Sequence, residues 1–380
     1  MIKDFAILSP IFVTLFWAVV FFAHNGERDR TKNHLGVFMM FAFLLYCTHA
    51  VFFSNLFILY AYLEGLYIFT MLAVYPMYFI YILSVTTEKV TLKKKVTHLI
   101  PAFVLSAVSI VMTFILTKEQ RIFFVQDTLI DKNLKGLNWN SAIGIKGHIF
   151  FISRIIFLLQ VVYYAIAGIK VANRHNKRVE NFYSDVQGKL LNWVRDLSII
   201  IPIVGVASIV FAIIGRSYFT RNEVSLLIPS AIFSIILFEI GLKGNQQLQI
   251  NDELFEGFDP TGEEIKVSQK EQLKNNLIRL FESDKIYKQT DLRITTVSEC
   301  LKTNRTYVSR LINEEFNINF NEFVNRYRVK EARELLNSRN NYLYTMELIA
   351  EKSGFGSVNS FTRVFKELEG VTPGQFKNNG

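Results

Sequence analysis

The sequence predicts an all-α protein in which a bundle of about seven transmembrane helices precedes a cytoplasmic domain with two helix-turn-helix units. Of its 380 residues, 51% are hydrophobic and 14% aromatic, and the mean hydropathy is +0.25. Soluble domains rarely have such a composition. The long uncharged runs all lie before residue 243. Beyond residue 268 apolar residues recur at spacings of three and four, which is typical of amphipathic helices.

Charge divides the chain into three regions. Residues 1–243 hold 23 basic and 13 acidic side chains, residues 244–267 one and six, and residues 268–380 18 and 14. The sequence therefore predicts a transmembrane domain over 1–243, an exposed acidic linker over 244–267 and a folded domain over 268–380. Only Cys47 and Cys300 occur, so the chain has no disulfide framework and no cysteine-based zinc site.

Transmembrane helices are predicted from the length of the apolar runs, because a bilayer core about 30 Å thick requires roughly 20 apolar residues in a helix. The seven predicted spans are Phe5–Ala23, Leu35–Phe53, Leu56–Val85, Val96–Leu116, His148–Ile169, Leu197–Ile214 and Val224–Leu242. The first could instead be a signal peptide, but its basic region is only Lys3 and no small-x-small pattern precedes His24. We therefore expect a retained helix.

The orientation follows from lysine and arginine in the short loops, since cytoplasmic loops carry the excess. Three alternate loops are basic, and they hold Arg28, Arg30, Lys32, Lys89, Lys93, Lys94, Lys95, Arg174, Lys177, Arg178, Lys189 and Arg195. We expect these loops inside the cell, with the N-terminus outside and the C-terminal domain in the cytoplasm. The long segment Thr117–Gly147 is then external, although it also carries several lysines.

Ionisable residues inside apolar runs are costly and usually have a function or a partner. In the predicted topology, His49, Glu64 and Arg154 lie toward the outer side of their helices, and Glu239 lies near the inner end of the last. One hypothesis is that His49, Glu64 and Arg154 form a pocket that receives a signal. The alternative is an ion pair that holds helices together.

The first helix-turn-helix unit is predicted after a helix over about 268–282. A helix near Thr295–Leu301 leads through Lys302-Thr303 into a second helix that begins at Asn304, a favourable N-cap. The apolar positions of this unit are Val297, Leu301, Val308 and Leu311. The opposite face then presents Arg305, Thr306, Ser309 and Arg310.

The second unit follows a long helix, Phe320–Asn337, whose length of about 27 Å approaches the 34 Å repeat of DNA. A helix that contains Met346–Ala350 meets a turn at Ser353-Gly354-Phe355, and Gly354 can adopt the positive φ of a tight turn. The expected core residues are Ile349, Phe361, Val364 and Phe365. The residues left free are Asn359, Ser360, Arg363 and Lys366.

The stretch "IAEKSGFGSVNSFTRVFKELEGVTPGQF", residues Ile349–Phe376, closely resembles the signature of the AraC/XylS family of bacterial regulators. The stretch Thr306–Leu336 resembles the first recognition helix and connecting helix of the same family. The resemblance covers about the last 110 residues. It departs from the family pattern at Lys302, where glycine is frequent, and at Ile312-Asn313, where Phe-Lys is frequent.

The resemblance implies sequence-specific binding to double-stranded DNA, frequent activation of transcription, dimers and contact with RNA polymerase. Basic and small polar residues on the two recognition faces favour contact with DNA over a merely solvated helix face. Arginine suits guanine and asparagine suits adenine, while Lys366 suits phosphate. Together with the membrane half, it predicts a transcription regulator of the bacterial inner membrane that couples a ligand, a membrane signal or an envelope partner to gene expression.

Two alternative interpretations belong to other classes of protein. A transporter or receptor with an autoregulatory DNA-binding domain should show polar residues in several helices near the midplane or recognisable repeats, and neither is evident. An enzyme is not favoured, because the six histidines lack metal-ligand spacing and no Walker-type phosphate loop occurs. We expect no cofactor and no metal.

Overall fold

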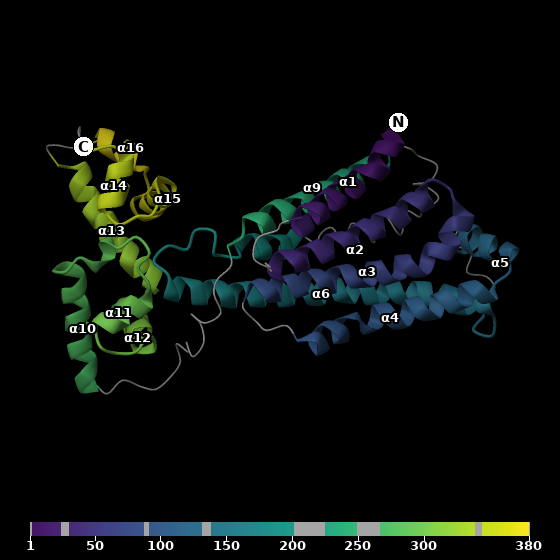
Figure 1. Cartoon of the computed structure of the whole chain (residues 1–380), viewed down its shortest axis with the longest axis horizontal. Helices are drawn as coiled ribbons and strands as arrows, with labels where there is room; N and C mark the ends of the chain where they lie inside the picture. Colours follow the sequence, from purple (N-terminus) through teal and green to yellow (C-terminus); the bar gives the residue numbers. More distant parts are fainter. Residues whose placement is uncertain are drawn as a thin grey trace. The chain divides into compact units, whose positions relative to one another are not determined.

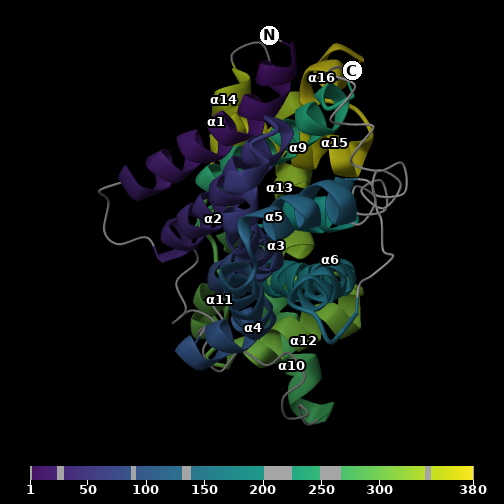
Figure 2. The ribbon, with the colours of Figure 1, turned by 90° about the vertical axis from the view of Figure 1, so that its right-hand side faces the viewer.

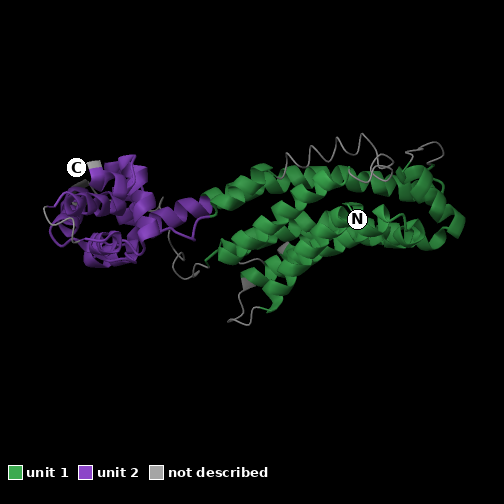
Figure 3. Cartoon of the chain, turned by 90° about the horizontal axis from the view of Figure 1, so that it is seen from above, with its two compact units in different colours: residues 1–173, 191–250 green, residues 174–190, 251–380 purple. Residues whose placement is uncertain are grey.

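The computed structural model describes residues 2–23, 30–86, 91–130, 138–200, 225–248, 267–338 and 344–379. The chain divides into two compact units: unit 1 comprises 1–173 and 191–250, and unit 2 comprises 174–190 and 251–380 (Figure 3). Among the described residues the regular elements are helices, with one isolated antiparallel bridge between Tyr183 and Arg293. The predicted all-α class is confirmed.

Six described helices are long and apolar enough to cross a membrane. They are α1 (Ile2–Ala23), α2 (Arg30–Phe53), α3 (Phe57–Val85), α4 (Leu92–Ile115), α6 (Ala142–Phe182) and α9 (Leu227–Gln246). The predicted span Leu197–Ile214 lies for most of its length outside the described residues. Six of the seven predicted spans therefore correspond to helices that the structure describes.

Helix α3 is the central helix of unit 1, with α2 and α4 packed against it and α1 against α2 and α9 (Figures 1 and 2). In its most apolar stretch of 18 residues, 78% of the stretch is buried, against 22–39% in the corresponding stretches of the other five candidate spans. The aromatic side chains of Tyr60 and Tyr81 are almost wholly buried on it. Helices α1 and α9 approach closely at Gly241, because glycine has no Cβ. A Cβ there would overlap the indole of Trp17.

Part of the segment expected outside the membrane is helical. A capping box at Thr117 and Gln120 starts α5 (Lys118–Phe123), and a π-helix, η1 (Phe124–Ile130), follows. Helix α6 begins at Ala142, before the predicted start at His148. Lys146 consequently lies within a helix and is fully buried, whereas the sequence suggested an exposed loop lysine. The reason is a buried acidic partner on α3.

Unit 2 contains the helices of the C-terminal part of the chain. They are α10 (Val267–Glu282), the 3-10 helix η3 (Ile286–Lys288), α11 (Ile294–Cys300), α12 (Arg305–Phe316), α13 (Phe320–Leu336), α14 (Met346–Lys352), α15 (Val358–Glu369) and α16 (Pro373–Asn379). Helix α13 contacts α12, α14 and α15. It packs Phe323 and Tyr327 against Phe281 of α10, with ring centroids 4.9 and 5.1 Å from that of Phe281. The long helix predicted between the two helix-turn-helix units is thus confirmed as α13, with Asn337 as its C-cap.

Candidate nucleic-acid interface and bundle cavity

The first helix-turn-helix unit consists of α11 and α12. The side chain of Asn304 accepts a hydrogen bond of 2.8 Å from the backbone N–H of Tyr307, which confirms the predicted N-cap. Val297, Val308 and Leu311 are fully buried beneath the turn. Lys302 adopts a left-handed conformation with φ 51°, which glycine would adopt at lower cost.

The second unit consists of α14 and α15. The Ser357 hydroxyl caps α15 by accepting a hydrogen bond of 3.1 Å from the N–H of Ser360. The core of this unit includes Ile349, Phe361 and Phe365, as predicted. Gly354 has φ 88°, and a Cβ on it would overlap the carbonyl oxygen of Tyr287 and lie 2.7 Å from the Cα of Lys288. The turn therefore requires glycine for its backbone conformation and for lack of space.

Gly354→Ala is expected to lower the free energy of unfolding of unit 2 by about 3 kcal/mol, because the strained φ and the overlap add. Resistance of unit 2 to protease over a urea series, in the full-length protein in nanodiscs, measures this loss. The matched control is Gly374→Ala, since a Cβ at Gly374 meets nothing within 4 Å. Equal urea midpoints for the two variants would contradict the requirement.

The eight predicted DNA-contacting residues differ in accessibility. Asn359, Arg363 and Lys366 are exposed, Arg305, Thr306 and Arg310 are partly buried, and Ser309 and Ser360 are buried. Two of the arginines have acidic neighbours one helical turn away. Arg363 donates to Glu367 over 3.1 Å, and Arg310 Nε lies 4.0 Å from Glu314. The exposed pair of Arg363 and Glu367 is weak enough for a DNA phosphate to replace it.

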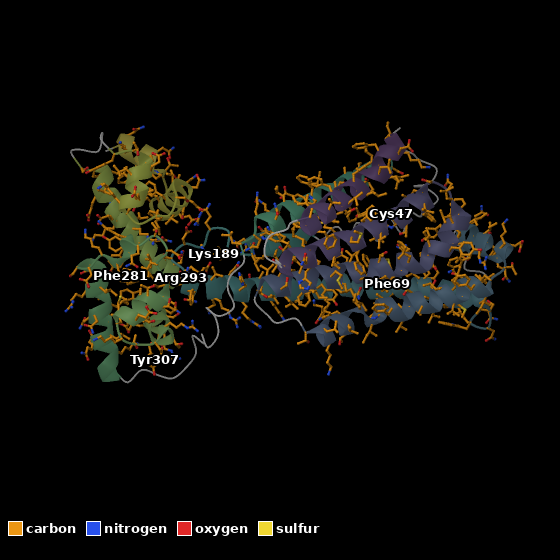
Figure 4. All side chains as sticks on the ribbon, viewed as in Figure 1. Cys47, Phe69, Lys189, Phe281, Arg293 and Tyr307 are labelled. Carbon is orange, nitrogen blue, oxygen red and sulfur yellow. The ribbon has the colours of Figure 1, made fainter. Side chains whose placement is uncertain are left out.

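Residues 174–190, hereafter the docking segment, also belong to unit 2. The Tyr183 ring lies beneath two cations, with Lys189 Nζ 5.0 Å and Arg293 Cζ 5.8 Å from its centroid (Figure 4 labels both basic residues). The sequence assigned these residues to a basic cytoplasmic loop of the transmembrane domain. Nothing in their composition distinguishes a loop that packs on the C-terminal helices from a solvated one.

Arg328 is a second feature that the sequence did not reveal. Its side chain is 1% exposed, and it donates to the carbonyls of Tyr287 (2.9 Å) and Gln289 (2.7 Å) and to the Ser184 hydroxyl (3.1 Å). Burial lowers the pKa of Arg328 to about 10, while Asp185 and Asp291 act in the opposite direction. The guanidinium is therefore charged at pH 7 and joins α13 to the docking segment.

Unit 1 contains a partly open cavity of about 570 Å³ lined mainly by aromatic and aliphatic side chains. Its polar wall includes His49 and Arg154, two of the three residues singled out as a candidate signal site. Both contact Tyr67: Arg154 donates to its hydroxyl over 2.8 Å, and the His49 ring centroid lies 5.4 Å from that of Tyr67. The hydroxyls of Thr128 and Tyr78, which also line the cavity, form no hydrogen bond with any described residue.

Glu64, the third predicted signal residue, does not line the cavity. It lies in a separate buried cluster, where Lys146 Nζ approaches its carboxylate to 2.7 Å and the Ser109 hydroxyl donates to it. Lys146 also donates to the Thr113 hydroxyl. The cluster connects α3, α4 and α6. Glu64 therefore belongs to an ion pair between helices, which was the alternative to a signal site. Among the described residues, no group of three His, Cys, Asp or Glu side chains is arranged to hold a metal ion.

Comparison with known proteins identifies the C-terminal part. The family model of a helix-turn-helix domain, of AraC type, matches residues 297–379. An uncharacterized HTH-type transcriptional regulator of Bacillus subtilis, YfiF, is 37% identical over 87 residues, which are 23% of this chain and 26% of YfiF. The regulatory protein PocR of Salmonella typhimurium is 33% identical over 87 residues, which are 23% of this chain and 28% of PocR.

Another uncharacterized regulator of Bacillus subtilis, YtdP, is 29% identical over 125 residues, which are 32% of this chain and 15% of YtdP. The C-terminal domain of the two-component response regulator yesN from Fusobacterium nucleatum is 26% identical, with coverage of 29% of this chain and 98% of that one and a TM-score of 0.24. The chain thus spans between 15% and 28% of the length of the three curated relatives. Residues 297–379 thus match a helix-turn-helix domain, and they are similar to the corresponding part of these regulators.

Proposed function

We propose that the chain is a membrane-embedded transcription regulator, which binds specific DNA sequences. The premise is that residues 297–379 form an AraC-type helix-turn-helix domain. The observation that carries the proposal is the presence, in one chain, of this domain and six helices suited to a bilayer. The positions of lysine and arginine support a cytoplasmic C-terminal domain and an external N-terminus at the bacterial inner membrane. A homodimer that contacts RNA polymerase and activates transcription is part of the proposal, and it rests on family resemblance.

In this proposal α12 and α15 are the recognition helices. Arg305, Thr306, Ser309 and Arg310 on α12 and Asn359, Ser360, Arg363 and Lys366 on α15 read bases or hold phosphates. The capped N-termini of both helices favour contact with an anionic backbone. The membrane half holds this domain near the bilayer and transmits a signal to it.

Genome-wide crosslinking of the tagged full-length protein to DNA tests the function. We expect discrete peaks for the wild type that disappear in an Arg305→Ala, Arg310→Ala, Arg363→Ala variant, because each arginine supplies charge and hydrogen bonds that alanine lacks. The matched control replaces Arg195, Arg326 and Arg333, which lie outside α12 and α15, with alanine. Equal enrichment for the wild type and the recognition-helix variant would overturn the assignment.

We further propose that the cavity of unit 1 receives the signal, at the wall formed by His49, Tyr67 and Arg154. Apolar pockets with a few convergent polar groups are typical sites for small molecules. The cavity fits an apolar or aromatic molecule that carries one polar or acidic group. Glu64 then acts through its ion pair with Lys146, by holding α3 and α6 in register beside the cavity.

A cavity-filling variant tests the signal site. Ala50 lines the cavity, whereas Leu59 is 47% exposed on α3 and does not line it. We expect a small molecule that copurifies with the wild-type protein, detected by mass spectrometry of the extracted protein, to be lost from Ala50→Phe and retained by Leu59→Phe. Equal amounts of the copurified molecule in both variants would show that it binds elsewhere, for example among the bound lipids.

A further inference from the structure

The docking segment is fixed to unit 2 by a specific anchor at Ser184. Its backbone N–H donates to the carbonyl of Leu292 over 3.1 Å, and its carbonyl accepts from Asn321 Nδ2 over 2.7 Å. Its hydroxyl accepts from Arg328 over 3.1 Å. The neighbouring side chains of Phe182 and Tyr183 are 0% and 4% exposed. All polar groups of Ser184 are therefore satisfied, as expected for a built contact.

From this anchor the segment reaches the first recognition helix. The hydroxyl of Ser309 is within 3.4 Å of Asn181 Oδ1, and the guanidinium of Arg305 lies 5.8 Å from the ring centroid of Phe182. Burial lowers the pKa of Arg305, in accord with its partial removal from water. Ser309 is 1% exposed. A base or phosphate cannot reach Ser309 while it is buried beside Asn181.

The same segment also covers the beginning of α15. The Ser360 hydroxyl is 3.4 Å from Asp185 Oδ1, and the Ser357 hydroxyl is 3.3 Å from Gln187 Oε1. A Cβ at Gly356 would lie 3.6 Å from Asp185 Oδ2. Ser360 is 3% exposed. A carboxylate thus lies at the N-terminus of a recognition helix, where a DNA phosphate would otherwise bind.

We propose that the docking segment is an intramolecular inhibitor that occupies the DNA-reading faces of α12 and α15 and must withdraw before DNA binds. The inference rests on the proposed DNA-binding function. One short segment contacts both recognition helices, and it contributes an acidic side chain at the second. Its hydrogen bonds with α12 and α15 are long, at 3.3–3.4 Å, and therefore weak, whereas those of the Ser184 anchor are shorter and buried. The reading faces can therefore be uncovered without unfolding unit 2.

The start of the docking segment is also the end of α6. That helix carries Arg154 of the cavity wall and continues without interruption to Phe182. A shift or rotation of α6 on signal binding would consequently move Asn181 and Phe182. The segment thereby gives the signal a route to DNA binding that needs no change within the helix-turn-helix units.

The test compares DNA affinities of full-length proteins in nanodiscs. An Asn181→Ala, Asp185→Ala, Gln187→Ala variant removes contacts with both recognition helices and retains Ser184. With sheared genomic DNA as the probe, we expect this variant to bind about tenfold more tightly than the wild type, because a larger fraction is competent to bind. The control is Asp196→Ala, which removes the same charge from an exposed residue that pairs with Arg195.

A second measurement follows the segment itself. Amides of residues 179–182 and 185–187 in the wild-type protein should exchange hydrogen faster when the DNA is added, since DNA displaces these residues while the Ser184 anchor holds. Equal affinity of the triple variant, the control and the wild type, or unchanged exchange with DNA bound, overturns the inhibitory role while the DNA-binding function stands. Absence of DNA binding by every protein, the triple variant included, overturns the function and the inference with it.

Discussion

Arg328→Met is expected to lower the free energy of unfolding of unit 2 by about 3–5 kcal/mol, one of the two largest effects of a single substitution that we predict. Methionine matches much of the volume of arginine but donates no hydrogen bond. The buried carbonyl of Tyr287 and the partly buried carbonyl of Gln289 would then lose their donor, and the Ser184 anchor would lose one of its three bonds.

Protease resistance of unit 2 over a urea series, in the full-length protein, measures the effect. The control is Arg326→Met on the same helix, because Arg326 is 56% exposed and pairs with Glu322 one helical turn away. Such a pair contributes a few tenths of a kcal/mol. The pKa of Arg328 lies far above 7 in the folded and unfolded states, so the loss should be constant between pH 6 and 8. Similar urea midpoints for both variants would contradict a structural role for the buried guanidinium.

Lys146→Met is expected to destabilise unit 1 by about 3–5 kcal/mol, because it leaves the buried carboxylate of Glu64 without its cation. For a unit of this size the melting temperature should fall by roughly 10 °C. Adding Glu64→Leu should restore most of the loss, since an apolar pair of similar volume replaces a buried ion pair at little cost.

Reaction of Cys47 with a thiol-reactive fluorophore during heating reports the unfolding of unit 1, in a Cys300→Ser background that removes the other thiol. Lys170→Met provides the control, because Lys170 is an exposed lysine of the same helix. A double variant no more stable than Lys146→Met would show that the two charges do not stabilise each other. The double variant also tests whether Glu64 is needed for the signal response once the bundle is stable.

The periodicity of the sequence predicted helices α10 to α15 to within a few residues, because amphipathic spacing and capping residues are local properties, but it predicted neither η3 nor α16. Asn304 is an N-cap because of its own side chain, and Gly354 marks a turn because of its own backbone. The apolar runs likewise predicted six helices that the structure describes, since their length alone suits a bilayer.

Tertiary partners were harder to predict. Lys146 looked like a loop lysine because its partner, Glu64, is 82 residues away in sequence. Arg328 lies among other charged residues of α13, and in the sequence these charges look like those of a solvated helix face. The sequence predicted free side chains for Ser309 and Ser360, but both are buried, and each lies 3.4 Å from a side chain of the docking segment. Such contacts leave no periodic signal.

The central claim, that DNA is read by a protein held in the membrane, is tested most directly by flotation of vesicles. Sealed inside-out and right-side-out vesicles that contain the full-length protein are mixed with duplex DNA taken from a crosslinking peak and centrifuged through a density gradient. We predict that the DNA floats with inside-out vesicles alone, and that it is released by salt or by the Arg305, Arg310, Arg363 variant. DNA that stays at the bottom with both vesicle types, or that floats equally with the wild type and the variant, would contradict the account.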